Sequence, residues 1–144
     1  MAQAEKLAQV YASAFADTRP WSADEIRDLL NNPDVFICED DAGFAMGRVV
    51  LDEAELLTIC VLPTARGQGK GARLLRRFEE ASAKRGATRA FLEVAQNNAA
   101  ARRLYASNSW SEIGRRKHYY TALDGSRCDA IVLQKPLPPL QPTD

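Results

Sequence analysis

Residues 55–72 read ELLTICVLPTARGQGKGA, and this stretch sets the architecture expected for the whole chain. Its apolar first half, which ends at Leu62, predicts a buried strand, and Pro63 ends that strand because proline cannot donate to a sheet ladder. Three alternating glycines follow, and then the apolar spacing of a helix begins. A strand, a glycine-rich turn and a helix N-terminus together favour a bound anion, since unpaired N–H groups and the helix dipole both attract negative charge. We therefore expect residues 66–72 to bind a pyrophosphate.

Several kinds of phosphate loop compete for this segment. A Walker-type loop is excluded, because the Gly-Lys pair at 69–70 is followed by glycine and not by Ser or Thr. A dinucleotide fingerprint stays open, since Gly67-x-Gly69-x-x-Ala72 fits its pattern and Glu93 stands near the expected ribose-binding acid. However, the loop lies in mid-chain and only one more helix is expected after it. A loop that merely turns the chain also stays open, although its glycines cost backbone entropy.

The composition is that of an ordinary globular domain. The 144 residues suffice for one core, and 19 basic residues balance 19 acidic ones, which favours neither nucleic acid nor membrane as a partner. Three widely spaced cysteines predict no disulfide framework and no metal site. No apolar stretch approaches the ~18 residues of a membrane span. We expect a cytoplasmic monomer or weak dimer, with one domain over residues 1–135 and a loose, proline-rich tail over 136–144.

Periodicity and turn residues predict the remaining elements. A first helix is expected over residues 3–16, and a capping box of Ser22 and Glu25 opens a second helix that ends at Leu30. Short turns join strands at 35–38, 44–51 and 56–62, which implies an antiparallel meander. A helix over 69–85 that Gly86 closes, a strand at 89–95, a helix at 98–107 and a hairpin of 110–122 and 127–133 complete the order.

Glu93 is the candidate catalytic base. It interrupts the apolar run AFLEVA, a pattern typical of a sheet that is covered on both faces. Burying an unpaired carboxylate is costly, so this position suggests a function. The alternatives are an exposed strand end or an ion pair with a nearby arginine. Trp21 likewise has two interpretations, a hydrophobic staple or part of a substrate wall.

Several motifs resemble those of the GNAT acetyltransferase superfamily. Arg66-Gly-x-Gly69-x-Gly71 is similar to its acyl-CoA loop. The downstream motifs, namely Phe91-Leu-Glu93-Val, Asn98-Ala-Ala-Ala, Leu104-Tyr105, Tyr119-Tyr120 and Asp124-Gly-x-x-x-Asp129-Ala, resemble in order and spacing the bacterial ribosomal-protein-alanine N-acetyltransferases. The resemblance covers residues 20–135 and implies an α+β fold of GNAT type. That fold has a mixed, mostly antiparallel sheet of about six to seven strands flanked by about four helices.

The resemblance also implies a reaction and a set of roles. Acetyl-CoA would donate an acetyl group to the N-terminal amine of a protein, namely the N-terminal alanine of a small-subunit ribosomal protein, without a metal. Glu93 would act as base and Tyr105 as acid. The implied coenzyme contacts are Ile59, Cys60, Val61, Arg66, Gly67, Gln68, Gly69, Lys70, Gly71, Ala72 and Asn98, and the implied acceptor contacts are Trp21, Tyr119 and Tyr120.

Two departures from the family pattern follow Tyr105. The family usually reads Tyr-x3-Gly-Phe there, whereas this chain has Ser109-Trp110. We expect Asn108 to adopt the left-handed conformation in place of the missing glycine, and Trp110 to fill the core position. Two other functions stay open: acetylation of a small amine or lysine side chain, and an acyl-CoA-binding module without catalysis. One basic residue of the loop or its helix is expected to contact the coenzyme's ribose phosphate.

Overall fold

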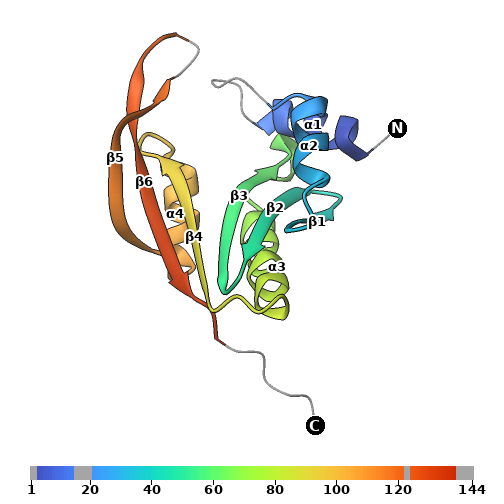
Figure 1. The fold of residues 1–144 in the computed structure, drawn as a ribbon. Helices are drawn as coiled ribbons and strands as arrows, with labels where there is room; N and C mark the ends of the chain where they lie inside the picture. Colours follow the sequence, from blue (N-terminus) through green and yellow to red (C-terminus); the bar gives the residue numbers. More distant parts are fainter. Residues whose placement is uncertain (1–2, 15–20, 122–123, 139–144) are drawn as a thin grey trace.

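The computed structural model describes residues 3–14, 21–121 and 124–138. These residues form four α-helices and a six-stranded sheet whose strand order is β1-β2-β3-β4-β6-β5 (Figure 1). The helices are α1 (Gln3–Ala14), α2 (Ala23–Leu30), α3 (Lys70–Lys84) and α4 (Ala99–Ser107), with a 3-10 turn η1 at Pro63–Ala65. The strands are β1 (Val35–Asp40), β2 (Gly43–Val50), β3 (Glu53–Val61), β4 (Arg89–Ala95), β5 (Ser111–Thr121) and β6 (Arg127–Pro136). The predicted mixed, mostly antiparallel α+β fold is confirmed.

Local signals start α2 and α4 and end α3 as the sequence predicts. Ser22 Oγ accepts a hydrogen bond from the Glu25 N–H at 3.1 Å, and the Glu25 carboxylate accepts from the Ser22 N–H at 3.2 Å. This reciprocal capping box fixes the start of α2. Gly86, with φ 93°, follows the last turn of α3. Asn98 caps α4, because its side-chain oxygen accepts from the Ala101 N–H at 3.1 Å.

The sheet opens between β3 and β4, which are the one parallel pair among the described strands. They pair at three positions, Glu53 with Arg89, Ala54 with Ala90 and Glu55 with Phe91. Beyond these pairs the two strands diverge toward their carboxyl ends, and Figure 1 shows the resulting V. The glycine loop follows β3 and Asn98 follows β4, so both lie at the open end.

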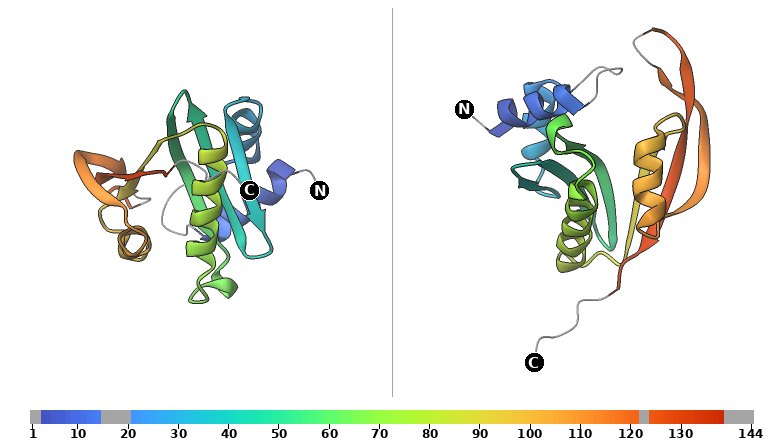
Figure 2. Two further views of the ribbon diagram at one scale, coloured as in Figure 1. Left: turned by 90° about the horizontal axis from the view of Figure 1, so that it is seen from below. Right: turned by 180° about the vertical axis from the view of Figure 1, so that it is seen from behind.

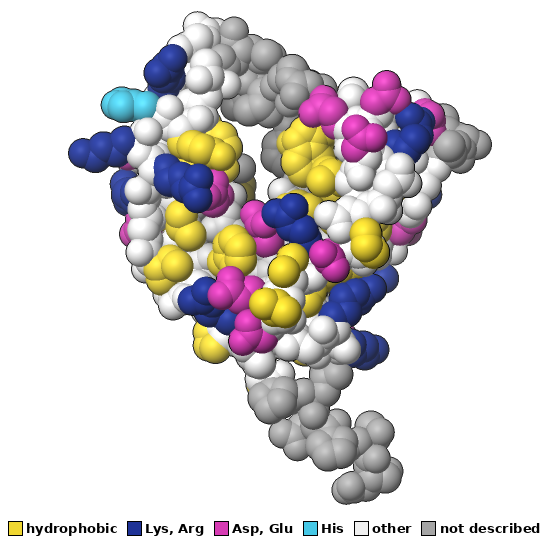
Figure 3. Space-filling model, in the orientation of Figure 1, with side chains coloured by type: hydrophobic (Ala, Val, Ile, Leu, Met, Phe, Trp, Pro, Cys, Tyr) yellow, Lys and Arg dark blue, Asp and Glu magenta, His cyan; other side chains and the backbone are white. Residues whose placement is uncertain are grey.

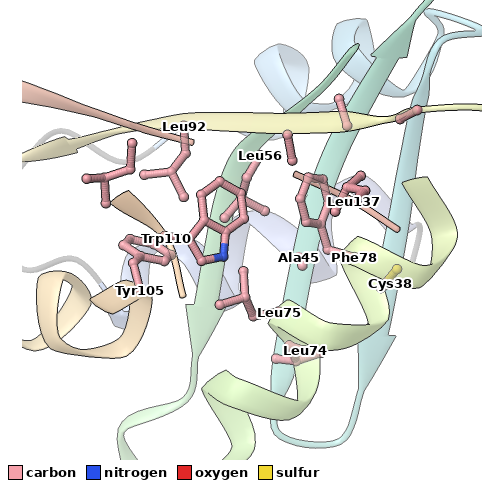
Figure 4. Close-up of a cluster of buried hydrophobic side chains, with 14 of the residues drawn as sticks. Cys38, Ala45, Leu56, Leu74, Leu75, Phe78, Leu92, Tyr105, Trp110 and Leu137 are labelled. Atoms are coloured by element: carbon pink, nitrogen blue, oxygen red, sulfur yellow. The ribbon is translucent and has the colours of Figure 1, made fainter. Parts of the chain in front are cut away.

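Two apolar cores cover the two faces of the sheet. On one face, α3 and α4 pack over a core that includes Leu74, Phe78 and Trp110 (Figure 4). Both helices are in front of the sheet in the rear view of Figure 2. On the other face, α1 and α2 contribute Leu7 and Ile26 to a second core. Within the described residues, no helix has both the length and the apolar character that crossing a membrane requires.

The carboxylate of Glu79 ties the two arms of the V together. It accepts from Trp110 Nε1 at 3.3 Å and forms an ion pair with Lys135 Nζ at 2.7 Å. Glu79 belongs to α3, whereas Lys135 belongs to β6. This contact lies among partly buried groups, so it joins the arms on the face where both helices pack.

Two details of the chain differ from the sequence prediction. Leu137 is buried, and its N–H donates to the Thr88 carbonyl at 2.9 Å, so the prediction of a loose chain beyond Pro136 is wrong for this residue. At the end of α4, Asn108 has φ −112°, and Ser109 instead takes the left-handed conformation, with φ 72°. The prediction for Asn108 is therefore wrong.

Ser109, and not Asn108, is left-handed because of two hydrogen bonds that close α4. The Trp110 N–H donates to the Tyr105 carbonyl at 3.1 Å, and the Ser109 N–H donates to the Ala106 carbonyl at 3.3 Å. This 6→1 and 5→2 pair is the Schellman motif, which requires its left-handed residue at the position after the C-cap. Asn108 is the C-cap, and its side chain donates to the Leu104 carbonyl at 2.7 Å.

Candidate active site

The glycine loop presents unpaired backbone donors, as predicted. Gly67 and Gly69 have φ 78° and 72°, and a Cβ added at either would meet no atom within 4 Å. Gly69 is the N-cap of α3 and has no side chain to cap it. Because the first N–H groups of a helix have no partner inside it, the start of α3 offers several donors to one anion. Gly71 has a packing role, since a Cβ there would lie 3.4 Å from Leu104.

Basic side chains near the loop divide into two groups. Arg73 forms an ion pair with Asp40 at 2.5 Å, and Arg77 donates to the Glu39 carbonyl at 3.1 Å. Both are thereby held by the end of β1. Lys70 and Arg76 form no ion pair within the described part of the chain. Of the basic residues in the first two turns of α3, Lys70 and Arg76 are therefore the pair available to an anion.

Glu93 lies on β4 at the open part of the V, and it has a partner. Burial alternates along β4, with Leu92 and Val94 buried and Glu93 half-buried on the opposite face. The expectation of coverage on both faces is thus wrong for β4, because its buried residues all face the core under α3 and α4 while its second face is only partly buried. The Glu93 carboxylate Oε1 lies 3.0 Å from Arg116 Nε of β5. The side chain of Glu93 is 20% exposed and that of Arg116 is 58% exposed, so the pair borders solvent.

The premise that Glu93 is an unpaired carboxylate is therefore wrong, and the alternative of an arginine ion pair is correct. The sequence offers no local signal for this partner, because Arg116 lies 23 positions further along the chain and reaches Glu93 across β6. Within the described residues, the second carboxylate oxygen of Glu93 forms no hydrogen bond or ion pair.

Tyr105 reaches the opening from the other face of the sheet. It is buried in the core with Trp110, whose ring centroid lies 6.1 Å away. Burial raises the pKa of Tyr105 well above its ordinary value, and the nearby Cys60 and Tyr120 raise it further. The phenol therefore stays protonated at neutral pH and can donate a proton.

Cys60 lies on β3 beside this phenol. Burial raises the pKa of its thiol to about 12, although a hydrogen bond with Thr58 lowers it slightly. A thiol that stays protonated is a poor nucleophile. The prediction that Cys60 is a strand residue is confirmed.

Aromatic side chains stand on both sides of the open end. Tyr11 of α1 stacks on Trp21, with ring centroids 5.0 Å apart. On the hairpin, Tyr119 and Tyr120 meet edge to face at 5.3 Å. Burial is the main cause that raises the pKa of Tyr120 to about 12. The nearby Glu93 raises this pKa further, and Tyr11 raises it by a smaller amount. In the space-filling view a hollow separates the hairpin from the α1–α2 side (Figure 3).

The structure thus brings together most of the residues predicted for the site. Glu93, Tyr105, Cys60 and Tyr120 lie around the opening, with the glycine loop at its end. Arg116 and Tyr11 were missed by the sequence analysis. A carboxylate, a protonated phenol and an anion-binding loop beside an unpaired strand edge are suited to acyl transfer to an amine.

Comparisons with known proteins agree with this arrangement. The chain matches the acetyltransferase (GNAT) family over residues 3–109. It is 44% identical over 96 residues to the ribosomal protein bS18-alanine N-acetyltransferase of Escherichia coli K12, which covers 67% of this chain and 64% of that protein. The alignment therefore spans less than two thirds of that relative's length.

Two further comparisons extend over more of the chain. The enzyme of the same name from Haemophilus ducreyi is 36% identical over 121 residues, covering 79% of this chain and 81% of that protein. The crystal structure of the ribosomal-protein-S18-alanine N-acetyltransferase from Escherichia coli superposes with a TM-score of 0.80 at 34% identity. That superposition covers 94% of this chain and 87% of the other.

Proposed function

Because this chain belongs to the GNAT acetyltransferase family, we propose that it moves the acetyl group of acetyl-CoA to the N-terminal amine of a protein. The N-terminal alanine of ribosomal protein bS18 is the proposed acceptor, since the relatives at 44% and 36% identity carry that activity in their names. The observation that carries the proposal is the early end of β3–β4 pairing, which stops after Glu55 and Phe91 although β3 continues toward the glycine loop. It leaves an unpaired strand edge that leads from the loop to Glu93 and Tyr105.

We place acetyl-CoA along this edge. Its pyrophosphate would accept hydrogen bonds from the N–H groups of residues 67–72, where two left-handed glycines keep Cβ atoms away. Lys70 or Arg76 would meet the ribose phosphate. The pantetheine arm would run along Ile59–Val61, and Asn98 would contact it from the start of α4.

The acceptor amine would enter between the hairpin and the α1–α2 side, past Trp21, Tyr119 and Tyr120. A protein α-amino group has a pKa of about 7.7–8.0, so a carboxylate can remove its proton directly or through water. The free amine forms a bond to the thioester carbonyl carbon, and an N–H of Ile59–Val61 would stabilise the resulting oxyanion. The C–S bond then breaks, Tyr105 gives its proton to the departing thiolate, and the extra proton that the amide nitrogen releases would return through water to the phenolate of Tyr105.

An assay with purified protein, acetyl-CoA and a synthetic peptide of the bS18 N-terminus tests this proposal. We expect acetylation of the α-amine and none of a peptide whose α-amine is blocked but whose lysines are free. Modification of lysine or of a small amine instead would support the competing enzyme functions. Binding of acetyl-CoA without turnover of any amine would support a non-catalytic module.

The proposed roles are tested by Glu93→Gln and Tyr105→Phe. Removing a general acid or base lowers the rate by about 10²–10⁴-fold, so each variant should lose kcat by that order while keeping its KM for acetyl-CoA. A Glu93→Gln variant with full turnover would refute its assignment as the base. Mass spectrometry of bS18 from cells that lack this gene tests the acceptor, because unchanged acetylation would exclude it.

A further inference from the structure

We propose that Asp129 of β6 is a positioning residue for acceptor binding, because its carboxylate holds a bulge in β5 that presents Arg116 and Tyr120 to Glu93. The inference rests on the proposed function and deepens it by naming what fixes the acceptor side of the site. Asp129 belongs to a motif of the sequence analysis, yet that analysis gave it no role.

The register of the hairpin defines the bulge. Arg116 of β5 pairs with Ala130 of β6, and the next pair is Tyr120 with Cys128. Three residues of β5, 117–119, thus lie opposite the single residue Asp129. A regular ladder would have one residue there, so β5 contains two extra residues. Such an insertion interrupts the ladder and re-aims the side chains that follow it.

The bulge has a strained residue and a single carboxylate that holds it. His118, in its middle, has φ 54°, a left-handed conformation that costs a residue with a Cβ about 1–2 kcal/mol. The His118 N–H donates to Asp129 Oδ1 at 3.0 Å. The hydrogen bond to a charged acceptor offsets the cost of this conformation, because charge-assisted bonds are about twice as strong as neutral ones.

The residues on either side of the bulge are those that meet Glu93. Arg116, just before it, forms the 3.0 Å ion pair with Glu93. Tyr120, just after it, lies near the same carboxylate, which contributes to its raised pKa. Tyr119 completes the group, since its ring centroid lies 5.3 Å from the Arg116 guanidinium carbon and 5.3 Å from the Tyr120 ring.

If β5 and β6 paired one to one beyond Arg116, Tyr120 would lie opposite residue 126 and not opposite Cys128, two positions further along β6. Arg116 and Tyr120 could then no longer both lie beside Glu93 at their present spacing. The Asp129 hydrogen bond therefore acts on the acceptor through Arg116, Tyr119 and Tyr120. It does not touch the coenzyme loop, which follows β3 on the other arm of the V.

Three variants test this proposal. Asp129→Ala removes the acceptor of the His118 hydrogen bond, and Asp129→Asn keeps an oxygen at the same place. Asp124→Ala is the matched control, because Asp124 also accepts from a backbone N–H, that of Ser126 at 2.9 Å, but at the hairpin turn. The readouts are KM for the acceptor peptide, KM for acetyl-CoA, and hydrogen exchange of a peptide spanning residues 116–121.

Asp129→Ala should raise the acceptor KM by about tenfold, as expected for one lost hydrogen bond, and leave the acetyl-CoA KM unchanged within about twofold. It should also speed exchange over residues 116–121, because the His118 amide loses its partner. Asp129→Asn should restore most of the acceptor KM, and Asp124→Ala should match the wild type. Equal effects of Asp129→Ala and Asp124→Ala, or a rise in both KM values without rescue by Asn, would overturn the proposal.

Failure of the proposed function gives a different result. A wild-type protein that acetylates no N-terminal peptide contradicts the function and says nothing against the bulge. Hydrogen exchange then decides the inference, because exchange in Asp129→Ala as slow as in the wild type would show that this carboxylate does not hold β5.

Discussion

Ser109→Gly should stabilise the protein, because Ser109 occupies the left-handed position that ends α4. Its φ of 72° places its Cβ too close to the following carbonyl, whereas glycine adopts this conformation freely. Both hydrogen bonds of the motif use main-chain atoms, the Ser109 N–H to Ala106 and the Trp110 N–H to Tyr105, and glycine keeps both. The substitution thus removes strain without removing a contact.

The expected size follows from two opposing contributions. Relief of the left-handed conformation gains about 1–2 kcal/mol. Glycine's extra freedom in the unfolded chain costs about 0.5–1 kcal/mol. The midpoints of these ranges differ by about 0.75 kcal/mol, which corresponds to a rise in Tm of about 2–3 °C for a domain of this size. Urea unfolding followed by circular dichroism and a thermal melt both measure it.

Asn108→Gly is the matched comparison. Asn108 has φ −112° and donates its side-chain amide to the Leu104 carbonyl, so glycine there relieves no strain and loses a bond. It should lower stability by about 1 kcal/mol. Acetyl transfer by Ser109→Gly should match the wild type, since Tyr105 keeps its place. A Ser109→Gly protein that is less stable than the wild type, or an Asn108→Gly protein that is more stable, would refute this account of the helix end.

Three further predictions concern packing, pH and the loop. Gly47→Ala should destabilise the fold by about 1–3 kcal/mol in urea unfolding, because its Cβ would lie 2.6 Å from a ring carbon of Phe78. Burial would raise the pKa of Asp40, but hydrogen bonds from Ala42 and Arg73 outweigh it, so the pKa is lowered. This carboxylate therefore stabilises the protein above its unfolded pKa of about 3.9, and that stability is lost as the pH falls through the lower folded value. Denaturant titrations should show a steeper acid loss for the wild type than for Asp40→Asn. Gly69→Ala should weaken acetyl-CoA binding in a thermal-shift titration, because φ 72° disfavours a Cβ at the cap of α3.

Features that depend on a few neighbouring residues could be read from the sequence. The capping box of Ser22 and Glu25 is contained in four residues, and Gly86 closes its helix with its own backbone. The glycine loop is equally local, since Gly67 and Gly69 take the left-handed conformations that their lack of a Cβ permits. In each case the partner of the signal is at most four positions away.

Features that depend on strand register could not be read in this way. The ion pair of Glu93 with Arg116 needs β6 to lie between their strands, and no pattern around either residue contains that order. The burial of Leu137 has the same origin, because its N–H finds the Thr88 carbonyl only after β6 has joined the sheet. Ser109 shows a third case, in which the motif geometry overrides the residue preference that pointed to Asn108.

The opening between β3 and β4 connects the features that local sequence predicts with those that strand register sets. Glu93 lies on the face of β4 opposite the core that holds Tyr105, and a closed sheet would separate them by its own backbone. Because pairing stops after Glu55 and Phe91, a substrate placed at the unpaired edge is exposed to both faces at once. The base and the acid can then act on the two ends of one acyl transfer, the incoming amine and the departing thiolate. The separation of the strands is thus as necessary to the proposed chemistry as either side chain.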